Sequence, residues 1–347
     1  MAKPKYNSID LFAGCGGLTE GMRRAGFSTK VAVELEAEPA NVFRLNHSKA
    51  SVIQQDIRTI DIEDVKAKLH GEPLHLLAGC PPCQGFSSVR KLNKKASVRD
   101  PRNQLVKEYF RFVDELRPQT LMMENVPGLA DYYLFKKIVR QLRTLGYWID
   151  VEVVNVKDYG VPQSRRRLVM VGSLLGPISV AKGLGETSTV RTAIGHLPAP
   201  SETSDPVHQI VAKHSDAVQH RIALTPKDGG SRKDLPPEYT LECHKDSKVG
   251  FNDVYGRLRW DAISTTITGG CLNPSKGRFL HPEQDRAITP REAALLQSFP
   301  ENYKFPTDIR KQSLALMIGN ALPPAFSFFQ SKNIAQHLDQ QSKLSSA

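Results

Sequence analysis

The turn at residues 10–17 reads Asp10-Leu11-Phe12-Ala13-Gly14-Cys15-Gly16-Gly17 and joins a short apolar run to a stretch with helical spacing. Glycines in such a turn let the backbone bend sharply and approach a ligand, and the helix start offers unpaired N–H groups. Glu34 follows the next predicted strand about 20 residues later, where an acidic side chain binds ribose hydroxyls in nucleoside-binding sheets. Asp56-Ile57 follows the third strand and is placed to meet an adenine ring. The sequence therefore predicts a nucleoside cofactor, although the turn lacks the Gly-x-Gly-x-x-Gly spacing of nicotinamide cofactors.

Short apolar runs alternate with stretches of helical spacing on both sides of this turn, as far as about residue 172. This alternation is typical of an α/β fold with a largely parallel sheet covered by helices. The predicted strands are 8–12, 31–33, 52–53, 74–78, 120–123, 149–154 and 168–171. The predicted helices are 18–25, 39–46, 62–69, 104–116 and 134–145.

The amino-acid composition changes between residues 173 and 286, where Pro, Gly, Ser and Thr are frequent. Six of the ten histidines lie in this segment. This segment is expected to form a smaller, irregular domain with short strands such as 262–268. A helix start returns at Thr289-Pro290-Arg291-Glu292, and helices are expected through Leu295, from Ser313 and again from Pro324. The predicted division is 1–172 for the main domain, 173–286 for the irregular domain, 287–338 for a helical return to the main domain, and 339–347 for a flexible tail.

The composition limits the class of protein. Lysine and arginine exceed aspartate and glutamate by 47 − 36 = 11. No apolar run approaches the roughly 18–20 residues of a membrane span, the first residues lack a signal-peptide core, and five cysteines form no obvious disulfide framework. We therefore expect a soluble cytoplasmic protein that does not bind membranes.

The positive charge is concentrated in two runs. Residues 1–172 hold 27 basic and 19 acidic side chains, or 27 − 19 = +8. Residues 85–105 contribute +5 and Arg165-Arg166-Arg167 contribute +3, so the rest of this segment is neutral. Concentrated basic loops favour a polyanionic partner, because phosphate contacts release counterions. The alternative is a pair of solvated basic loops.

The segment Cys80-Pro81-Pro82-Cys83 follows the fourth predicted strand, and three interpretations compete. The spacing suits a redox pair or half of a zinc site. A zinc site needs two further ligands, however, and the remaining cysteines, at 15, 243 and 271, are solitary, while the surrounding pattern is not thioredoxin-like. The third interpretation makes Cys83 a nucleophile, because nearby cations favour the reactive thiolate.

Two further motifs carry groups suited to chemistry. Glu124 ends the fifth predicted strand, close to the strand end that carries Cys83, and a carboxyl group in such an apolar setting suits a proton donor with a raised pKa. Arg165 and Arg167 precede the last strand and are expected to share a face as it begins. Their guanidinium groups offer forked donors to a carbonyl or a phosphate. Alternatively, Glu124 is an ordinary surface acid and the two arginines lie on a solvated edge of the sheet.

Taken in order, these motifs resemble those of the DNA (cytosine-5)-methyltransferases over nearly the whole chain. The matching stretches are 10–17, 82–84, 124–126, 163–167, 291–300 and 319–321. The resemblance implies a Rossmann-like S-adenosylmethionine-dependent methyltransferase fold, with residues 1–172 as the catalytic domain and 173–286 as the target-recognition domain. The sequence departs from the family at Leu35, where an aromatic residue is common, and at Arg166, where an acid is often found.

The resemblance implies a reaction at C5 of a flipped-out cytosine in double-stranded DNA. Its catalytic residues would be Cys83, which adds to C6, Glu124, which acts at N3, and Arg165 and Arg167, which hold the base. S-adenosylmethionine would be bound by Phe12, Gly14, Cys15, Gly16, Glu34, Leu35, Asp56, Ile57, Pro82, Leu105, Asn320 and Leu322. DNA would be contacted by Ser87, Arg90, Lys91, Lys94, Lys95, Arg99, Gln163 and Thr266.

Several broader expectations accompany this assignment. The protein is expected to need no metal, to be monomeric, to associate with the bacterial nucleoid through DNA, and to act in a restriction–modification system beside a separate endonuclease or as a solitary methylase. A tRNA cytosine-5 methyltransferase of related fold is the alternative function. A nicotinamide oxidoreductase would explain the first 60 residues but would leave Cys83, Glu124 and the arginines without a role.

Overall fold

The computed structural model describes residues 4–82, 104–185, 187–242 and 253–344. The chain forms two compact units. Unit 1 comprises residues 1–159, 166–185 and 322–347, and unit 2 comprises residues 160–165 and 186–321. In the described part of the chain, no helix combines the length and apolar character needed to span a membrane.

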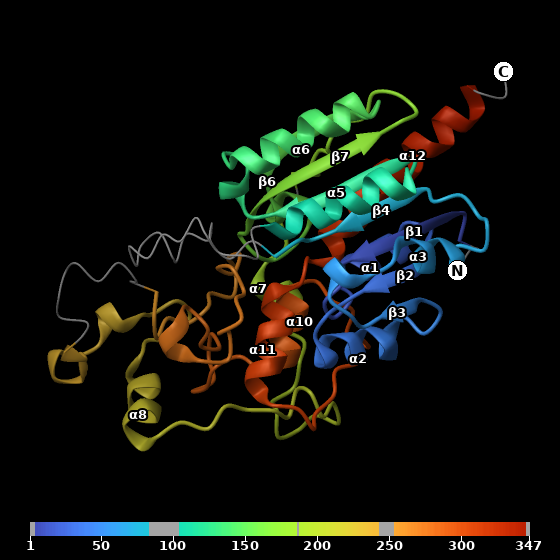
Figure 1. Cartoon of the computed structure of the whole chain (residues 1–347). Coiled ribbons are helices and arrows are strands. Elements are labelled where there is room, and N and C mark those ends of the chain that lie inside the picture. Colours follow the sequence, from blue (N-terminus) through green and yellow to red (C-terminus); the bar gives the residue numbers. More distant parts are fainter. Residues whose placement is uncertain (1–3, 83–103, 186, 243–252, 345–347) are drawn as a thin grey trace. The chain divides into compact units, whose positions relative to one another are not determined.

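Unit 1 contains a seven-stranded sheet in the order β3-β2-β1-β4-β5-β7-β6 (Figure 1). Its strands are β1 (Tyr6–Leu11), β2 (Phe27–Val33), β3 (Ser51–Ile53), β4 (Leu76–Gly79), β5 (Thr120–Asn125), β6 (Trp148–Asn155) and β7 (Arg166–Ser173). The first five strands pair in parallel, and β7 is antiparallel to both β5 and β6. The prediction of a mostly parallel sheet is confirmed, and each predicted strand of this sheet is present.

The helices of unit 1 are α1 (Gly17–Arg24), α2 (Ala37–Asn46), α3 (Ile62–Ala67), α5 (Leu105–Leu116), α6 (Tyr133–Thr144) and α12 (Pro324–Leu344). The strand order reverses at β1 and β4, and right-handed crossovers therefore place α1 and α5 on opposite faces of the sheet. The packing agrees, because Val31 and Val33 join a core with α3, α5 and α6, whereas Ala32 packs with Phe43 of α2. Ligand sites in such sheets lie where the order reverses, at the carboxyl ends of the strands.

Helices α1 and α12 pack closely at Gly21. The hydroxyl of Ser327 in α12 donates a hydrogen bond to the Leu18 carbonyl of α1 at 2.7 Å. A Cβ atom on Gly21 would lie 2.4 Å from the Ser327 Cβ and 2.5 Å from the Phe328 nitrogen. Since a backbone atom is among these neighbours, the contact cannot be relieved by a side-chain rotation alone, and only glycine fits.

We expect Gly21→Ala to lower the free energy of unfolding by about 2 kcal/mol, because overpacking forces the two helices apart. Chemical denaturation measures the change. Lys137→Ala, at an exposed position of α6, is the control and should have little effect. Equal stability of Gly21→Ala and the wild type would show that α1 and α12 do not approach this closely.

The end of α12 differs from the sequence prediction. The predicted flexible tail begins at residue 339, but the helix continues to Leu344. Asp339 explains the difference, because its carboxylate accepts a hydrogen bond from the Tyr6 hydroxyl at 2.6 Å and pairs with Lys5. The end of the helix is thereby attached to the start of β1.

Unit 2 contains short helices joined by irregular segments. Its α-helices are α7 (Val190–Ile194), α8 (Asp216–Leu224), α10 (Pro290–Leu296) and α11 (Lys311–Asn320). Helix α10 begins as predicted, since Thr289 and Glu292 form a capping box and Pro290 occupies the first turn. Residues 287–321 group with unit 2 rather than with the sheet. The functional domain boundaries given above stay a prediction.

The predicted strand at 262–268 is wrong, because only Ser264 forms a β-bridge there, to Gln163. Its other bonds are a mixture of backbone and side-chain contacts, and the Val190 N–H donates to the Ala262 carbonyl at 2.9 Å. The Ile267 N–H donates to the Gln163 Oε1 at 2.8 Å, and the Thr266 hydroxyl donates to the Ser164 carbonyl at 2.8 Å. A segment whose backbone pairs with a side chain cannot extend a ladder of strands.

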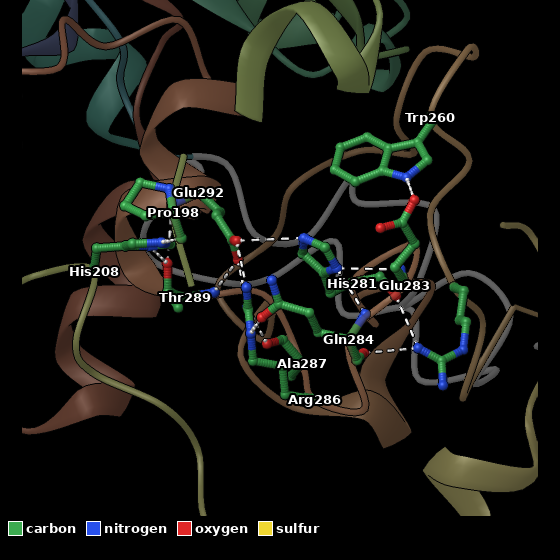
Figure 2. A network of polar contacts seen from close by, with 11 residues as sticks. Pro198, His208, Trp260, His281, Glu283, Gln284, Arg286, Ala287, Thr289 and Glu292 are labelled. Atoms are coloured by element: carbon green, nitrogen blue, oxygen red, sulfur yellow. Dashed lines mark hydrogen bonds and ion pairs between the residues drawn. The ribbon is translucent and has the colours of Figure 1, made fainter. Parts of the chain in front are cut away.

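A buried polar network holds the region before α10 together (Figure 2). Arg286 donates two hydrogen bonds to Glu292, both at 2.7 Å. The Nδ1 atom of His281 accepts from the N–H groups of Glu283 and Gln284, at 3.2 and 3.0 Å. Arg257, whose side chain is fully buried, donates to the carbonyls of His281 and Gln284 at 3.0 and 2.7 Å. An irregular segment is thus fixed by side-chain bonds instead of a sheet.

His281 makes the stability of this network depend on pH. Burial lowers the pKa of His281 from 6.5 to about 4, so the folded protein keeps it neutral, with Nδ1 free to accept. Between these values the unfolded chain binds the proton more readily, so the stabilisation is complete above the unfolded pKa and is lost as the pH falls toward the folded pKa. This shift corresponds to at most about 3 kcal/mol.

We expect His281→Asn to flatten the fall of unfolding free energy over this range, because the amide oxygen can replace Nδ1 without titrating. Denaturation at a series of pH values measures the slope. His220→Asn, at an exposed position of α8, should keep the wild-type slope. Equal slopes in the wild type and His281→Asn would show that His281 does not carry the effect.

Candidate active site

The turn after β1 has the open backbone that the glycines predict. Phe12, Gly14 and Gly16 have φ angles of 61°, 55° and 95°. A positive φ strains Phe12, a non-glycine residue, and such strain is concentrated at functional sites. A Cβ atom on Gly14 would meet nothing within 4 Å, and no side chain caps the first turn of α1 at Gly16. The turn therefore presents backbone beside open space.

Glu34, at the end of β2, is tied to this turn. Its Oε2 accepts from the Gly14 N–H at 2.7 Å and its Oε1 from the Glu36 N–H at 2.9 Å. Burial raises the pKa of this carboxyl group. The two carboxylate oxygens have four lone pairs, so the group can still accept a bond from a ligand hydroxyl. Leu35, next along the chain, is 56% exposed and offers an apolar surface.

Asp56 and Ile57, which follow β3, differ in how well they are placed to meet an adenine. Asp56 caps the short helix Ile57–Thr59, and hydrogen bonds from Arg58 lower the pKa of its carboxyl group to about 2. Asp56 is therefore ionised at neutral pH. The Ile57 side chain is only 4% exposed and belongs to the core, which leaves little of it for an adenine ring.

The other predicted cofactor residues are spread over both units. Cys15 is buried in the turn, and burial raises the pKa of its thiol to about 12. Leu105 begins α5 and packs partly against the core, and Pro82 is half-buried. Leu322 is buried in unit 1, whereas Asn320 is exposed at the end of α11 in unit 2.

Strands β4 and β5 bring the predicted acid beside the segment that leads to Cys83. Gly79 pairs with Met123, and the Asn125 Nδ2 donates to the Pro81 carbonyl at 2.8 Å. This hydrogen bond joins the two strand ends, and the sequence analysis did not find it. Its only signal was the Asn directly after Glu124. Cys83 and the predicted DNA contacts that follow it lie outside the described residues; these are Ser87, Arg90, Lys91, Lys94, Lys95 and Arg99.

The two predicted arginines have different environments. The Arg167 Nε lies 2.6 Å from the Glu124 Oε1, and both side chains are largely buried. Arg165 belongs to unit 2, where its Nη1 donates to the carbonyls of Ile267 and Gly319 at 3.0 and 2.8 Å. The strand β7 begins only at Arg166, so the expected shared strand face of Arg165 and Arg167 is wrong. Arg167 is the arginine that faces the acid.

Gln163 and Thr266, predicted to contact DNA, are engaged within unit 2. Gln163 is fully buried, and its Nε2 donates to the Gln297 Oε1 at 2.7 Å. A direct contact of this side chain with DNA therefore does not fit its burial. Thr266 is half-buried, with its hydroxyl bonded to the Ser164 carbonyl. Both side chains hold the 163–164 and 264–267 segments together.

Steric crowding explains why residue 319 is a glycine. A Cβ atom there would lie 2.1 Å from the Thr268 carbonyl carbon. Helix α11 can therefore approach the 264–268 segment only with glycine at this position. The same close approach brings the Gly319 carbonyl within reach of Arg165.

Metal ligands do not gather in the part of the chain that is described. No group of three His, Cys, Asp or Glu side chains there could hold a metal ion. Among these residues, Cys15, Cys80 and Cys271 form no disulfide.

Comparison with known proteins assigns this arrangement to a family. The sequence profile of the C-5 cytosine-specific DNA methylases matches residues 6–336. The chain belongs to this family. It is 34% identical to the Type II methylase M.HgiDII of Herpetosiphon aurantiacus, over 95% of each chain. It is 33% identical to the Type II methyltransferase M1.HphI of Haemophilus parahaemolyticus, over 91% of this chain and 83% of the relative.

Solved structures support the same fold. A protein described as a DNA modification methyltransferase encoded within an E. coli prophage is 27% identical, with a TM-score of 0.74, over 96% of this chain and all of the other. The Dnmt2 methyltransferase of S. pombe, at 17% identity and a TM-score of 0.68, shares the fold over 96% of this chain. The C5 methyltransferase is therefore an enzyme that uses S-adenosylmethionine, as its family does.

The residues of unit 1 fit this cofactor. The open space at Gly14 and the uncapped start of α1 suit the polar amino-acid part of S-adenosylmethionine. The spare acceptor capacity of Glu34 suits ribose hydroxyls. The exposed Leu35 and the ionised Asp56 suit the face and the edge of an adenine. The Gly14 turn, Glu34 and Leu35 fit the group as they stand, whereas the Asp56 carboxylate already accepts hydrogen bonds from Arg58.

Proposed function

We propose that this C5 methyltransferase modifies a specific sequence in double-stranded DNA through a covalent bond between Cys83 and C6 of a flipped-out cytosine. The observation that carries the proposal is the pairing of Glu124 with Arg167, at 2.6 Å, beside the strand end that leads to Cys83. Glu124 is 8% exposed, so its carboxyl group acts in a site with little competing water. Base flipping is required because the ring atoms are inaccessible in a stacked duplex.

The roles of the chain's residues follow from cytosine chemistry. The Cys83 thiolate forms a bond to C6 and transfers electron density to C5. Glu124 protonates or hydrogen-bonds N3 as charge develops on the ring. Arg167 fixes the carboxyl group of Glu124 and supplies positive charge beside the base. Bound S-adenosylmethionine supplies an electrophilic methyl group. Once C5 carries the methyl group, a water-mediated base takes the C5 proton and the Cys83 thiolate leaves. A proton placed on N3 returns to Glu124, and the aromatic ring is restored.

The remaining family roles are also part of the proposal. We assign residues 173–286 to target recognition, the basic residues between 85 and 105 to the DNA backbone, and Arg165 to the support of the base-holding segment. Gln163 is given a positioning role because it is buried. The relatives named Type II methylases suit a bacterial enzyme that acts beside a separate endonuclease or alone. We also propose that it works on chromosomal DNA in the cytoplasm as a monomer.

The experiment that tests this function offers two nucleic acids to the full-length enzyme. Purified protein and labelled S-adenosylmethionine are incubated with double-stranded DNA or with tRNA, and bisulfite sequencing then locates modified cytosines. We expect label in DNA, at C5 of one cytosine within one recurring sequence. Label in tRNA alone would favour the alternative function. Modification of adenine or of the cytosine amino group would contradict the proposed chemistry.

A further inference from the structure

Cys80 faces the proposed catalytic acid across two neighbouring strands. Gly79 of β4 pairs with Met123 of β5 in parallel register, so the next residues along the two strands are Cys80 and Glu124. Residues paired in this way point to the same face of the sheet. The Glu124 carboxylate lies within hydrogen-bonding reach of the Cys80 thiol. Cys80 thus contacts Glu124 on the side of β4, whereas Arg167 contacts it from β7.

The backbone on both sides of Cys80 is fixed. Its N–H donates to the Leu11 carbonyl at 3.2 Å, and the carbonyl of the following Pro81 accepts from the Asn125 side chain at 2.8 Å. Cys80 is therefore held against β1 and β5 at once. A side chain that starts from a fixed backbone position can orient the group that it contacts.

The charges around Cys80 keep it as a thiol. The groups that face it are Asp10 of β1, Glu124 of β5, Arg167 of β7 and Tyr109 of α5. Burial and the two carboxylates raise the pKa of the Cys80 thiol well above its usual value. At neutral pH the sulfur therefore carries its proton, and it can donate to the Glu124 carboxylate while Arg167 donates from the other side.

We propose that Cys80 is a positioning residue for the methyl transfer, whose S–H group and Arg167 together hold the Glu124 carboxyl group in the orientation that meets N3 of the cytosine. This role rests on the function proposed for Glu124. It separates the two cysteines of the Cys-Pro-Pro-Cys segment by function, since Cys83 reacts with the base and Cys80 orients the acid. It also gives the segment's first cysteine a role that requires neither a metal nor a disulfide.

The test compares Cys80→Ala and Cys80→Ser, with Cys271→Ala, a fully buried cysteine of unit 2, as the control. Single-turnover methylation of DNA is measured over a range of pH on both sides of neutrality, together with the affinities for DNA and S-adenosylmethionine. We expect Cys80→Ala to slow methylation about threefold to tenfold, the equivalent of one hydrogen bond, without changing either affinity. The pH profile of the methylation rate should also change in Cys80→Ala, because the Glu124 carboxylate loses a hydrogen-bond donor. The Cys80→Ser hydroxyl should restore the rate to within about twofold and restore the profile.

Two outcomes would overturn the proposal. The first is a Cys80→Ala enzyme with the wild-type rate and pH profile. The second is equal slowing by alanine and serine with an unchanged pH profile, which would mean that the sulfur only packs. Glu124→Gln is measured in the same assay. If it turns over at the wild-type rate, the function proposed for Glu124 fails. If it is slow and Cys80→Ala equals the wild type, only the role of Cys80 fails.

Discussion

Cys83→Ala is expected to abolish methylation, with a loss on the order of a thousandfold or more, while DNA binding persists. The physical reason is that cytosine C5 is a poor nucleophile until a thiolate adds at C6, and alanine offers no such group. Binding should remain because the basic residues that follow Cys83 are unchanged in this variant. Methyl transfer from labelled S-adenosylmethionine and a DNA titration measure the two properties separately.

Cys271→Ala is the matched control for this change, since it also removes one thiol but from the buried interior of unit 2. It should retain methylation. Full turnover by Cys83→Ala would remove this residue from the mechanism, and a parallel loss of DNA binding would mean that the substitution disturbs the structure rather than the chemistry.

Glu124→Gln is expected to lower the methylation rate by about 10²–10³-fold, with little change in DNA affinity. Glutamine cannot transfer a proton to N3, and its amide leaves the buried Arg167 guanidinium without a negative partner at 2.6 Å. The rate constant in single turnover reports the chemical step. Glu152→Gln, an exposed position of β6, makes the same change of charge away from β5 and should behave as the wild type.

The stability of the Glu124→Gln variant shows whether its loss of activity comes from unfolding or from the chemical step. If the loss came from unfolding, the denaturation midpoint would fall with the activity. The proposal requires a folded Glu124→Gln protein that binds DNA and S-adenosylmethionine but transfers the methyl group slowly. A variant with normal turnover would contradict the assignment of Glu124 as the acid.

Local pattern predicted the sheet and its helices because both depend on short-range alternation of apolar residues. The strand at residues 168–171 and the helix at 104–116 were found for this reason, as was the start of α10 with its capping box. The strand predicted at 262–268 failed because its backbone bonds go to separate partners, the Ile267 N–H to the Gln163 side chain and the Ala262 carbonyl to the Val190 N–H. A contact between residues so far apart in the chain leaves no periodic signal.

In the candidate site, too, features that follow from local pattern were predicted, and features that depend on distant contacts were not. The glycines of the turn, Glu34 and Glu124 were predicted to lie at strand ends, and the parallel register places them there. The separation of Arg165 from Arg167 was not predicted, because alternation along a strand says nothing about where the strand begins. The tail from residue 339 was expected to fray because its tie to Lys5 and Tyr6 could not be predicted. That contact joins opposite ends of the sequence and leaves no local pattern.

The central claim is that one sulfur, that of Cys83, bonds to the target base during turnover. DNA that carries 5-fluorocytosine at the modified position tests it directly, because fluorine at C5 cannot leave as a proton does and the intermediate is trapped. Mass spectrometry of the digested complex should find the peptide with Cys83 linked to a methylated fluorocytosine. A digest taken under turnover conditions with Cys83 unmodified, or with the adduct on another residue, would contradict the mechanism.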